Sequence, residues 1–222
     1  MSKRWESIPQ LFKRRTAFVF GGGPSLKLLE PYRDHFQTRM TLAVNGALTL
    51  LPEATVHFFG DSRWYWRERE RVDAYKGVKV SANKTFHGRD PSLETVEGDI
   101  VLMPCFSFGF NCNYMMSALG WNRSSGAAAI NLAYLMGACR IVLFGFDMRT
   151  VDDRTDYFHS PTVVNAGAKF PSGNWENMLF GMAKMVDSMR RQRIDIPIFN
   201  ATPGSALKLF PIMDVAKAVR YG

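Results

Sequence analysis

The stretch Thr16-Ala-Phe-Val-Phe-Gly-Gly-Gly-Pro-Ser25 decides the expected fold. Its apolar, β-favouring residues meet three consecutive glycines, and a helix-compatible segment follows. The pattern predicts a buried strand at 16–20, a tight turn and a helix that begins at Ser25, which is a good N-cap. Glycines let the backbone approach a ligand closely, and the free N–H groups of a helix N-terminus suit a phosphate or a carboxylate. A structural β-to-α turn without a ligand has the same pattern.

Short apolar segments alternate with helical patterns along the rest of the chain. Further strands are expected at 40–44, 55–59, 78–80, 100–103, 140–145 and 197–199, and helices at 25–35, 62–75, 124–136 and 174–191. This alternation is typical of an α/β protein with a Rossmann-like, mostly parallel sheet and helices on both faces. We expect a basic leader at 1–15 and a single domain at 16–222, with an irregular insertion at about 81–123.

The composition is that of an ordinary globular protein. A chain of 222 residues suits one full α/β domain, and 46% of its residues are hydrophobic and 22% charged. No apolar run reaches the ~20 residues of a membrane span, and the first residues lack the apolar core of a signal peptide, so a cytoplasmic location is expected. Three cysteines fit a reducing compartment, and their spacing matches no zinc pattern. We expect Cys139 to be buried.

The formal net charge of +8 favours polyanionic partners such as nucleic acid and nucleotides. Basic residues crowd the first fifteen positions, and a second group, which includes Arg63 and Arg67, flanks Trp64. Basic residues interleaved with aromatic residues can hold phosphates and stack bases, so Arg63, Trp64 and Arg67 are candidate nucleic-acid contacts. A solvated basic surface is the alternative interpretation.

Small, amide, hydroxyl and carboxylate residues follow five of the expected strands. Because ligands of open parallel sheets bind outside the carboxyl ends of the strands, these residues predict a shared ligand pocket. They are Gly21, Gly22, Gly23, Pro24 and Ser25 after the first strand, Asn45 after the second, Asp61 after the third, Asp147 after the strand at 140–145, and Asn200 and Ser205 after the last. Ser124, Ser125 and Gly126, at the start of a helix, add a second anion-accepting N-terminus. Ordinary turn chemistry is the alternative for each of them.

The candidate catalytic residues are His159 and Asp147. His159 lies in a polar loop after the strand-end Asp147, and a histidine is suited to deprotonate a hydroxyl acceptor near neutral pH. There is no Walker A lysine motif and no Gly-x-Gly-x-x-Gly pattern, which disfavours a P-loop kinase and an NAD enzyme. No compact Asp-x-Asp motif occurs either, and no metal site is expected.

Six segments carry a family resemblance. They are Phe-Gly-Gly-Gly-Pro-Ser-Leu26, Ala-Val-Asn-Gly46, Phe-Phe-Gly-Asp61, Ser-Ser-Gly-Ala-Ala-Ala-Ile-Asn-Leu-Ala133, Ile-Val-Leu-Phe-Gly-Phe-Asp-Met148 and Asn-Ala-Thr-Pro-Gly-Ser205. In this order they resemble phage and prophage proteins of the MptE-like family, which includes archaeal 6-hydroxymethylpterin diphosphokinases. More distantly, the chain is similar to bacterial sialyltransferases that use CMP-sialic acid. The resemblance extends from about Thr16 to about Pro211.

The resemblance implies a Rossmann-like fold that binds a nucleotide at the strand ends. In the sialyltransferase-like relatives, a Gly-x-Gly-Pro-Ser turn and an Asn after the second strand contact the cytidine nucleotide, a His is the general base, and no metal is needed. Those nucleotide contacts would here fall on Gly21, Gly23, Pro24, Ser25 and Asn45, with Ser124–Gly126 near the donor. Gly22 stands where these relatives usually have Asn.

The first hypothesis is therefore a nucleotide-dependent transferase: a glycosyltransferase with a cytidine or uridine nucleotide-sugar donor and a hydroxyl acceptor. One candidate acceptor is a modified base in phage DNA. A phage-encoded protein would meet this acceptor in the cytoplasm of the host. The second hypothesis is an MptE-like diphosphokinase, in which Asp61 and Asp147 would bind Mg²⁺. The third is a non-catalytic module that binds nucleotides or DNA. No membrane partner is expected.

Overall fold

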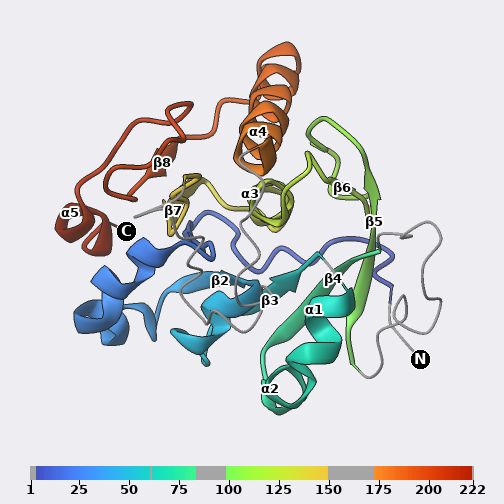
Figure 1. Ribbon diagram of the computed structural model, residues 1–222. Helices are drawn as coiled ribbons and strands as arrows, with labels where there is room; N and C mark the ends of the chain where they lie inside the picture. Colours follow the sequence, from blue (N-terminus) through green and yellow to red (C-terminus); the bar gives the residue numbers. More distant parts are fainter. Residues whose placement is uncertain (1–3, 61, 84–98, 150–172, 222) are drawn as a thin grey trace.

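A parallel eight-stranded sheet forms the centre of the computed structural model, which describes residues 4–60, 62–83, 99–149 and 173–221 (Figure 1). All of its strand pairings are parallel. The strands are β1 (Thr16–Phe20), β2 (Met40–Val44), β3 (Val56–Phe59), β4 (Val78–Asn83), β5 (Val101–Phe106), β6 (Leu119–Gly120), β7 (Arg140–Phe144) and β8 (Ile198–Asn200). The expected Rossmann-like α/β architecture is confirmed.

The strand order places β1 near the middle of the sheet. It reads β6-β5-β4-β3-β2-β1-β7-β8, so the chain moves outward from β1 to β6 and then returns to the other side of β1. The helix α3 (Ser125–Leu135) makes this return and lies against β1, β2, β3, β6 and β7. Strand order therefore reverses between β1 and β7.

Helices cover both faces of the sheet. On one face lie α3 and, packed on it, α4 (Gly173–Arg191); on the other lie the 3₁₀ helix η1 (Pro24–Phe36) and the helices α1 and α2 (Figure 1). The remaining elements are η2 (Asn45–Thr49), α1 (Ser62–Arg67), α2 (Arg69–Ala74) and α5 (Val215–Val219). In the described part of the chain, no helix has the length and apolar character needed to cross a membrane.

The alternation of side chains along β1 divides the core into two layers. Ala17 and Val19 pack with α3 and α4, whereas Phe18 and Phe20 pack with η1. On the η1 face four phenylalanine rings have centroids between 4.9 and 6.3 Å apart; they are Phe18, Phe20, Phe36 and Phe144. Burying each such ring contributes about 1.5–3 kcal/mol, so these rings fix η1 against the sheet.

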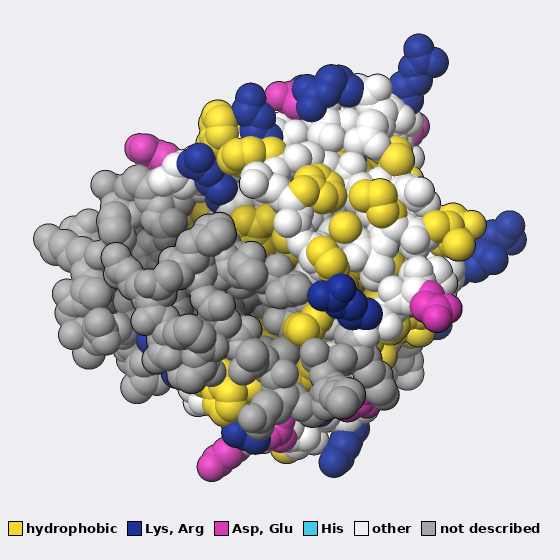
Figure 2. Space-filling model, turned by 90° about the vertical axis from the view of Figure 1, so that its right-hand side faces the viewer, with side chains coloured by type: hydrophobic (Ala, Val, Ile, Leu, Met, Phe, Trp, Pro, Cys, Tyr) yellow, Lys and Arg dark blue, Asp and Glu magenta, His cyan; other side chains and the backbone are white. Residues whose placement is uncertain are grey.

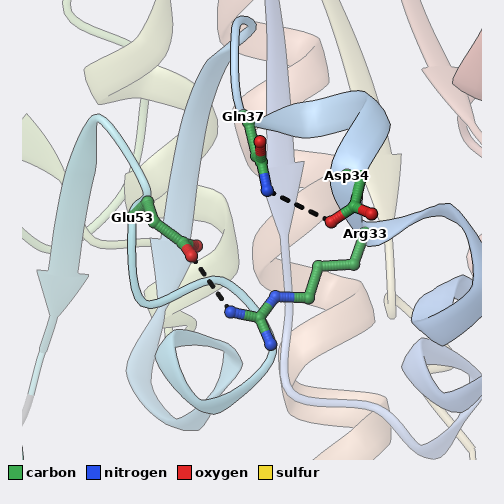
Figure 3. Close-up of polar contacts among 4 residues, drawn as sticks. All are labelled: Arg33, Asp34, Gln37 and Glu53. Atoms are coloured by element: carbon green, nitrogen blue, oxygen red, sulfur yellow. Dashed lines mark hydrogen bonds and ion pairs between the residues drawn. The ribbon is translucent and has the colours of Figure 1, made fainter.

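The outer end of η1 also has polar contacts. Arg33 Nη2 donates to Glu53 Oε1 at 3.0 Å, and Gln37 Nε2 donates to Asp34 Oδ1 at 3.1 Å (Figure 3). Because these side chains are exposed, such contacts contribute roughly 0–1 kcal/mol each. The aromatic layer and not this surface network holds η1 in place.

Several sequence expectations differ from the structure in detail. The helix expected at 25–35 is a 3₁₀ helix that begins at Pro24 and contains Pro31. The helix expected at 62–75 is divided into α1 and α2 at Glu68. In the region expected to be irregular, 81–123, the strand expected at 100–103 is β5, and β6 is present in addition. Both η2 and α5 were not expected, since neither has a long periodic pattern.

The described part of the basic leader, residues 4–15, packs against the rest of the domain. Ile8 and Phe12 are buried in the core, and the Phe12 N–H donates to the Met136 carbonyl at 2.8 Å. The Cys139 N–H in turn donates to the Arg15 carbonyl at 3.1 Å. The side chain of Cys139 is exposed, so the expectation of a buried thiol is wrong.

Candidate functional site

The reversal of strand order between β1 and β7 marks the candidate site. In open α/β sheets, ligands bind in the crevice outside the carboxyl ends of the strands at such a reversal. The glycine turn, 21–23, follows β1, and Gly145-Phe146-Asp147 follows β7. These two segments, far apart in the sequence, lie side by side because β1 and β7 are paired.

The glycine turn packs closely against the end of β7. The Gly21 N–H donates to the Phe144 carbonyl at 2.7 Å, and the Gly23 N–H donates to the Gly145 carbonyl at 2.9 Å. A Cβ at Gly21 would lie 2.6 Å from the Gly145 oxygen, and one at Gly23 would overlap the Asp147 carboxylate. Both glycines are therefore required by contacts within the protein.

Ser25 does not cap the helix that follows the turn. Gly23 is the N-cap of η1 and Pro24 begins the helix, so the expectation of a Ser25 cap is wrong. The Ser25 Oγ instead donates to Asp147 Oδ2 at 2.7 Å. Ser25 thus links the start of η1 to the end of β7.

Asp147 is the one charged residue buried at this crevice among the described residues. It is only 4% exposed and makes no ion pair with any described residue. Burial raises the pKa of its carboxyl. Hydrogen bonds from the hydroxyl and backbone N–H of Ser25 and from its own N–H lower this pKa, as does the attraction of Arg149, but burial is the largest effect. A buried carboxylate with a perturbed pKa in a crevice is typical of a functional site.

The position of Asp147 changes what the glycine turn can bind. The carboxylate contacts Gly23 and Ser25 at the N-terminus of η1, where a phosphate was expected. A phosphate at the same place would be repelled by the ionised carboxylate. Hydroxyl groups, which donate hydrogen bonds to carboxylates, fit there better than phosphate oxygens.

Asn45 contributes an open acceptor at the end of β2. Its backbone has a positive φ of 50°, and its Oδ1 is buried without a hydrogen-bond partner among the described residues. A buried amide oxygen without a partner costs free energy, so a ligand N–H or O–H there would be favourable. Asn45 was expected to contact a ligand, and this unpaired oxygen is the group through which it would do so.

His57 fixes the backbone of Asn45 from the next strand. It is fully buried, and its Nε2 lies 3.1 Å from the Asn45 carbonyl oxygen. The pKa of His57 is lowered to about 3, mainly by burial. The hydrogen bond to Asn45 raises this pKa, and the charges of Lys79 and Arg71 lower it. The imidazole is therefore neutral, and its Nε2–H donates to Asn45.

The start of α3 lies at the same edge of the sheet. Ser124 caps the helix by accepting hydrogen bonds from the Gly126 and Ala127 N–H groups. A Cβ at Gly126 would lie 2.7 Å from the Phe146 ring, and one at Gly60 would lie 2.7 Å from the Ser125 Oγ. The expected second helix N-terminus is thus beside the ends of β3 and β7.

Asn200 and Ser205 form an internal network after β8. The Asn200 amide donates to Ser205 Oγ at 3.0 Å, and Ser205 Oγ donates to the Phe146 carbonyl at 2.6 Å. Both residues are buried. Their hydrogen bonds hold the segment that carries Asp147, so these side chains position the site and do not face a ligand directly.

Thr202 is a positioning residue that the sequence did not indicate. Its Oγ1 accepts a hydrogen bond from the Phe146 N–H at 3.0 Å, and the nearby Ala206 N–H donates to the Asp147 carbonyl at 2.9 Å. Its place in the strand-end segment 200–205 was the signal that could have identified it.

Several expected site residues cannot be placed at the crevice. Asp61 and His159 lie outside the described residues, as does the side chain of Arg63. Trp64 is 6% exposed and packs against His57 and Phe59, so its ring is not available to stack on a base. Arg67 is exposed on α1.

No group of three or more His, Cys, Asp or Glu side chains that could hold a metal ion occurs within the described ranges.

Comparisons with family models, curated proteins and solved structures found no match to this chain.

Proposed function

We propose that this protein is a nucleotide-dependent transferase, specifically a glycosyltransferase with a nucleotide-sugar donor and a hydroxyl acceptor. The observation that carries the proposal is Asp147, a buried carboxylate at the reversal of strand order, hydrogen-bonded to Ser25 of the glycine turn. Such a carboxylate accepts hydrogen bonds, and the hydroxyls of a sugar or a ribose are ligand groups that donate them. The resemblance to sialyltransferase-like proteins supports the same function.

The donor would lie across the carboxyl ends of β1, β2 and β7. Its sugar or ribose hydroxyls would donate to Asp147, and its phosphate would approach the α3 N-terminus at Ser125 and Gly126, away from that carboxylate. The unpaired Asn45 Oδ1 would accept a hydrogen bond from the base, and a cytosine amino group or a uracil N–H would serve. Asp61 would contribute to the sugar or base contacts.

The reaction exchanges one bond at the donor's anomeric carbon. The acceptor oxygen forms a bond to that carbon, and the bond from the carbon to the phosphate oxygen breaks. The nucleotide leaves with the bonding electrons, and a general base takes the acceptor proton. His159 is our proposed base, on the basis of its place in the sequence after Asp147.

A thermal-shift series over CMP, CDP, UDP, GDP and ATP, with and without Mg²⁺, tests this proposal. A ligand at a hundred times its Kd stabilises the native state by about 2.7 kcal/mol, which raises Tm by several degrees for a chain of this size. We expect a cytidine or uridine nucleotide to produce this shift without metal. Asp147→Asn should abolish the shift, and Glu53→Gln, which removes an exposed carboxylate, should leave it unchanged.

Two other results would replace the proposal. Stabilisation by ATP only with Mg²⁺ would favour the MptE-like diphosphokinase. Stabilisation by duplex DNA that salt abolishes, with no effect of any nucleotide, would favour a non-catalytic binding module.

A further inference from the structure

Two exposed phenylalanines and two cations form a compact surface cluster, which we call the aromatic platform: Phe108, Arg123, Phe180 and Lys184. Phe108 is 40% and Phe180 47% exposed, and their rings meet edge to face with centroids 5.9 Å apart. The Arg123 guanidinium carbon lies 5.2 Å from the Phe108 centroid and 5.5 Å from the Phe180 centroid. Lys184 Nζ lies 5.2 Å from the Phe180 centroid.

A buried asparagine fixes the loops that carry this platform. Asn122 is fully buried; its side chain donates to the Gly109 carbonyl and accepts from the Gly109 N–H, both at 2.8 Å. Gly181 of α4 lies so close to the Asn122 carbonyl that it has no room for a Cβ. Because Asn122 is next to Arg123, Gly109 next to Phe108 and Gly181 next to Phe180, these contacts set the positions of all three side chains.

The platform lies at the same edge of the sheet as the candidate site. Phe108 follows the carboxyl end of β5, and Arg123 immediately precedes Ser124, the cap of α3. Between them, Trp121 packs against Gly60 at the end of β3, where Ser125 also lies. A long ligand on the platform would therefore extend toward the crevice.

The charges around the platform favour an anionic ligand. The chain has a net charge of +8, and α4 carries the exposed cations Lys184, Arg190 and Arg191, with Asp187 within 3.6 Å of Arg190. Figure 2 shows Lys and Arg side chains among hydrophobic ones on the β5–β6 side of the molecule. In a two-fold symmetric dimer through this surface, Arg123 and Lys184 of one copy would face Arg123 and Lys184 of the other. The repulsion between these like charges disfavours self-association through the platform.

We propose that the aromatic platform binds single-stranded nucleic acid. Bases would stack on the exposed phenylalanine rings and on the Arg123 guanidinium plane, and Lys184 would contact the phosphates. This site replaces the Trp64 segment as the nucleic-acid contact, since the Trp64 ring is buried. The platform can bind whether or not the crevice transfers a sugar, so the proposal goes beyond the proposed function.

Fluorescence anisotropy of a labelled oligothymidylate with the full chain tests this proposal. We expect binding at low salt, and a Kd about tenfold higher for Phe180→Ala and for Phe108→Ala, because stacking contributes to the affinity for each base. Phe180→Trp should retain affinity. Lys184→Gln should reduce the slope of log K against log salt by about 0.7. Leu28→Ala and Lys217→Gln, which truncate exposed side chains on η1 and α5, are the matched controls and should bind as the unaltered chain does.

Three results would overturn the proposal. The first is no binding of the oligonucleotide at low salt. The second is equal affinity of the Phe180→Ala variant and the unaltered chain, with polyphosphate competing as well as DNA, which would mean general electrostatic attraction. The third is a dimer that Phe180→Ala converts to a monomer in light-scattering measurements, which would identify the platform as an interface between copies.

Discussion

Asp147 is buried without an ion pair to any described residue, although the charge of Arg149 lowers the pKa of its carboxyl. Hydrogen bonds from Ser25 compensate this burial only in part, because the pKa of the carboxyl is raised despite them. Residues that cost stability and lie in a crevice are typical of functional sites. The loss of stability at Asp147 is therefore measurable apart from any activity.

Asp147→Asn should make the protein more stable at neutral pH while it removes nucleotide binding. The folded pKa of Asp147 is above its ordinary value of 3.8, so the native state binds more protons than the unfolded state from that pH upward. The free energy of unfolding consequently falls as the pH rises through the folded pKa. His57 contributes the opposite pH dependence over this range, so the measurement is the difference between the variant and the unaltered chain: in urea unfolding, the gain in stability of Asp147→Asn should be larger at pH 7 than at pH 4. An equal gain at the two pH values would contradict this expectation.

His57 should make the protein sensitive to acid. Its pKa is about 3 in the folded state and 6.5 ordinarily, so between these values the unfolded state binds more protons. The contribution of His57 to the free energy of unfolding is therefore fully present above pH 6.5. It is lost as the pH falls toward 3, by at most about 1.4 kcal/mol per pH unit. His57→Phe should flatten the dependence of the free energy of unfolding on pH in this window. His35→Gln, at an exposed histidine, should retain it.

The described strands other than β6 could be predicted from the sequence, because each is a short apolar run between turn residues. The 3₁₀ form of η1 could not, since it depends on prolines at both its start and its middle and on the aromatic layer beneath it. β6 is only two residues long and is ordered by its pairing with β5, a contact without a sequence pattern. The burial of Trp64 depends on which face of α1 meets the sheet, and an aromatic run does not specify that face.

Asn122 should be essential to the loops that join β5, β6 and α3. Asn122→Ala removes hydrogen bonds to both groups of Gly109 and to the Gly120 carbonyl, and leaves buried polar groups unpaired. We expect a loss of about 2–4 kcal/mol in the free energy of unfolding, measured with urea. Asn177→Ala, at an exposed position on α4, should change it by less than about 0.5 kcal/mol. Equal effects of the two substitutions would mean that the loop is not held by Asn122.

Gly23 should be coupled to Asp147 across the paired strands β1 and β7. Gly23→Ala places a methyl group where the Asp147 carboxylate lies, and overpacking of this kind costs about 1–3 kcal/mol. In an Asp147→Ala background the cost should be smaller, because part of the space is then free. A double-mutant cycle on the free energy of unfolding measures this coupling. Additive effects would contradict the contact.

At the scale of the whole molecule, parallel topology brings strand ends together that are distant in the sequence. The recurrence of polar residues after the strands was sufficient to predict a shared edge. The hydrogen bond between Ser25 and Asp147 was not predictable, because it joins residues 122 positions apart and requires β7 to return beside β1. Phe180 likewise meets Phe108 and Arg123, which are distant from it in the sequence, because α4 packs on α3.

Backbone amide chemical shifts, recorded while the most stabilising nucleotide is titrated into the protein, test the location of the site most directly. We expect the largest changes at Gly21–Ser25, at 124–126 and at 145–147, where β1, α3 and β7 meet. The same titration of Asp147→Asn should produce no saturable change. Shifts confined to other parts of the sheet, or none at saturating nucleotide, would contradict a nucleotide site between β1 and β7.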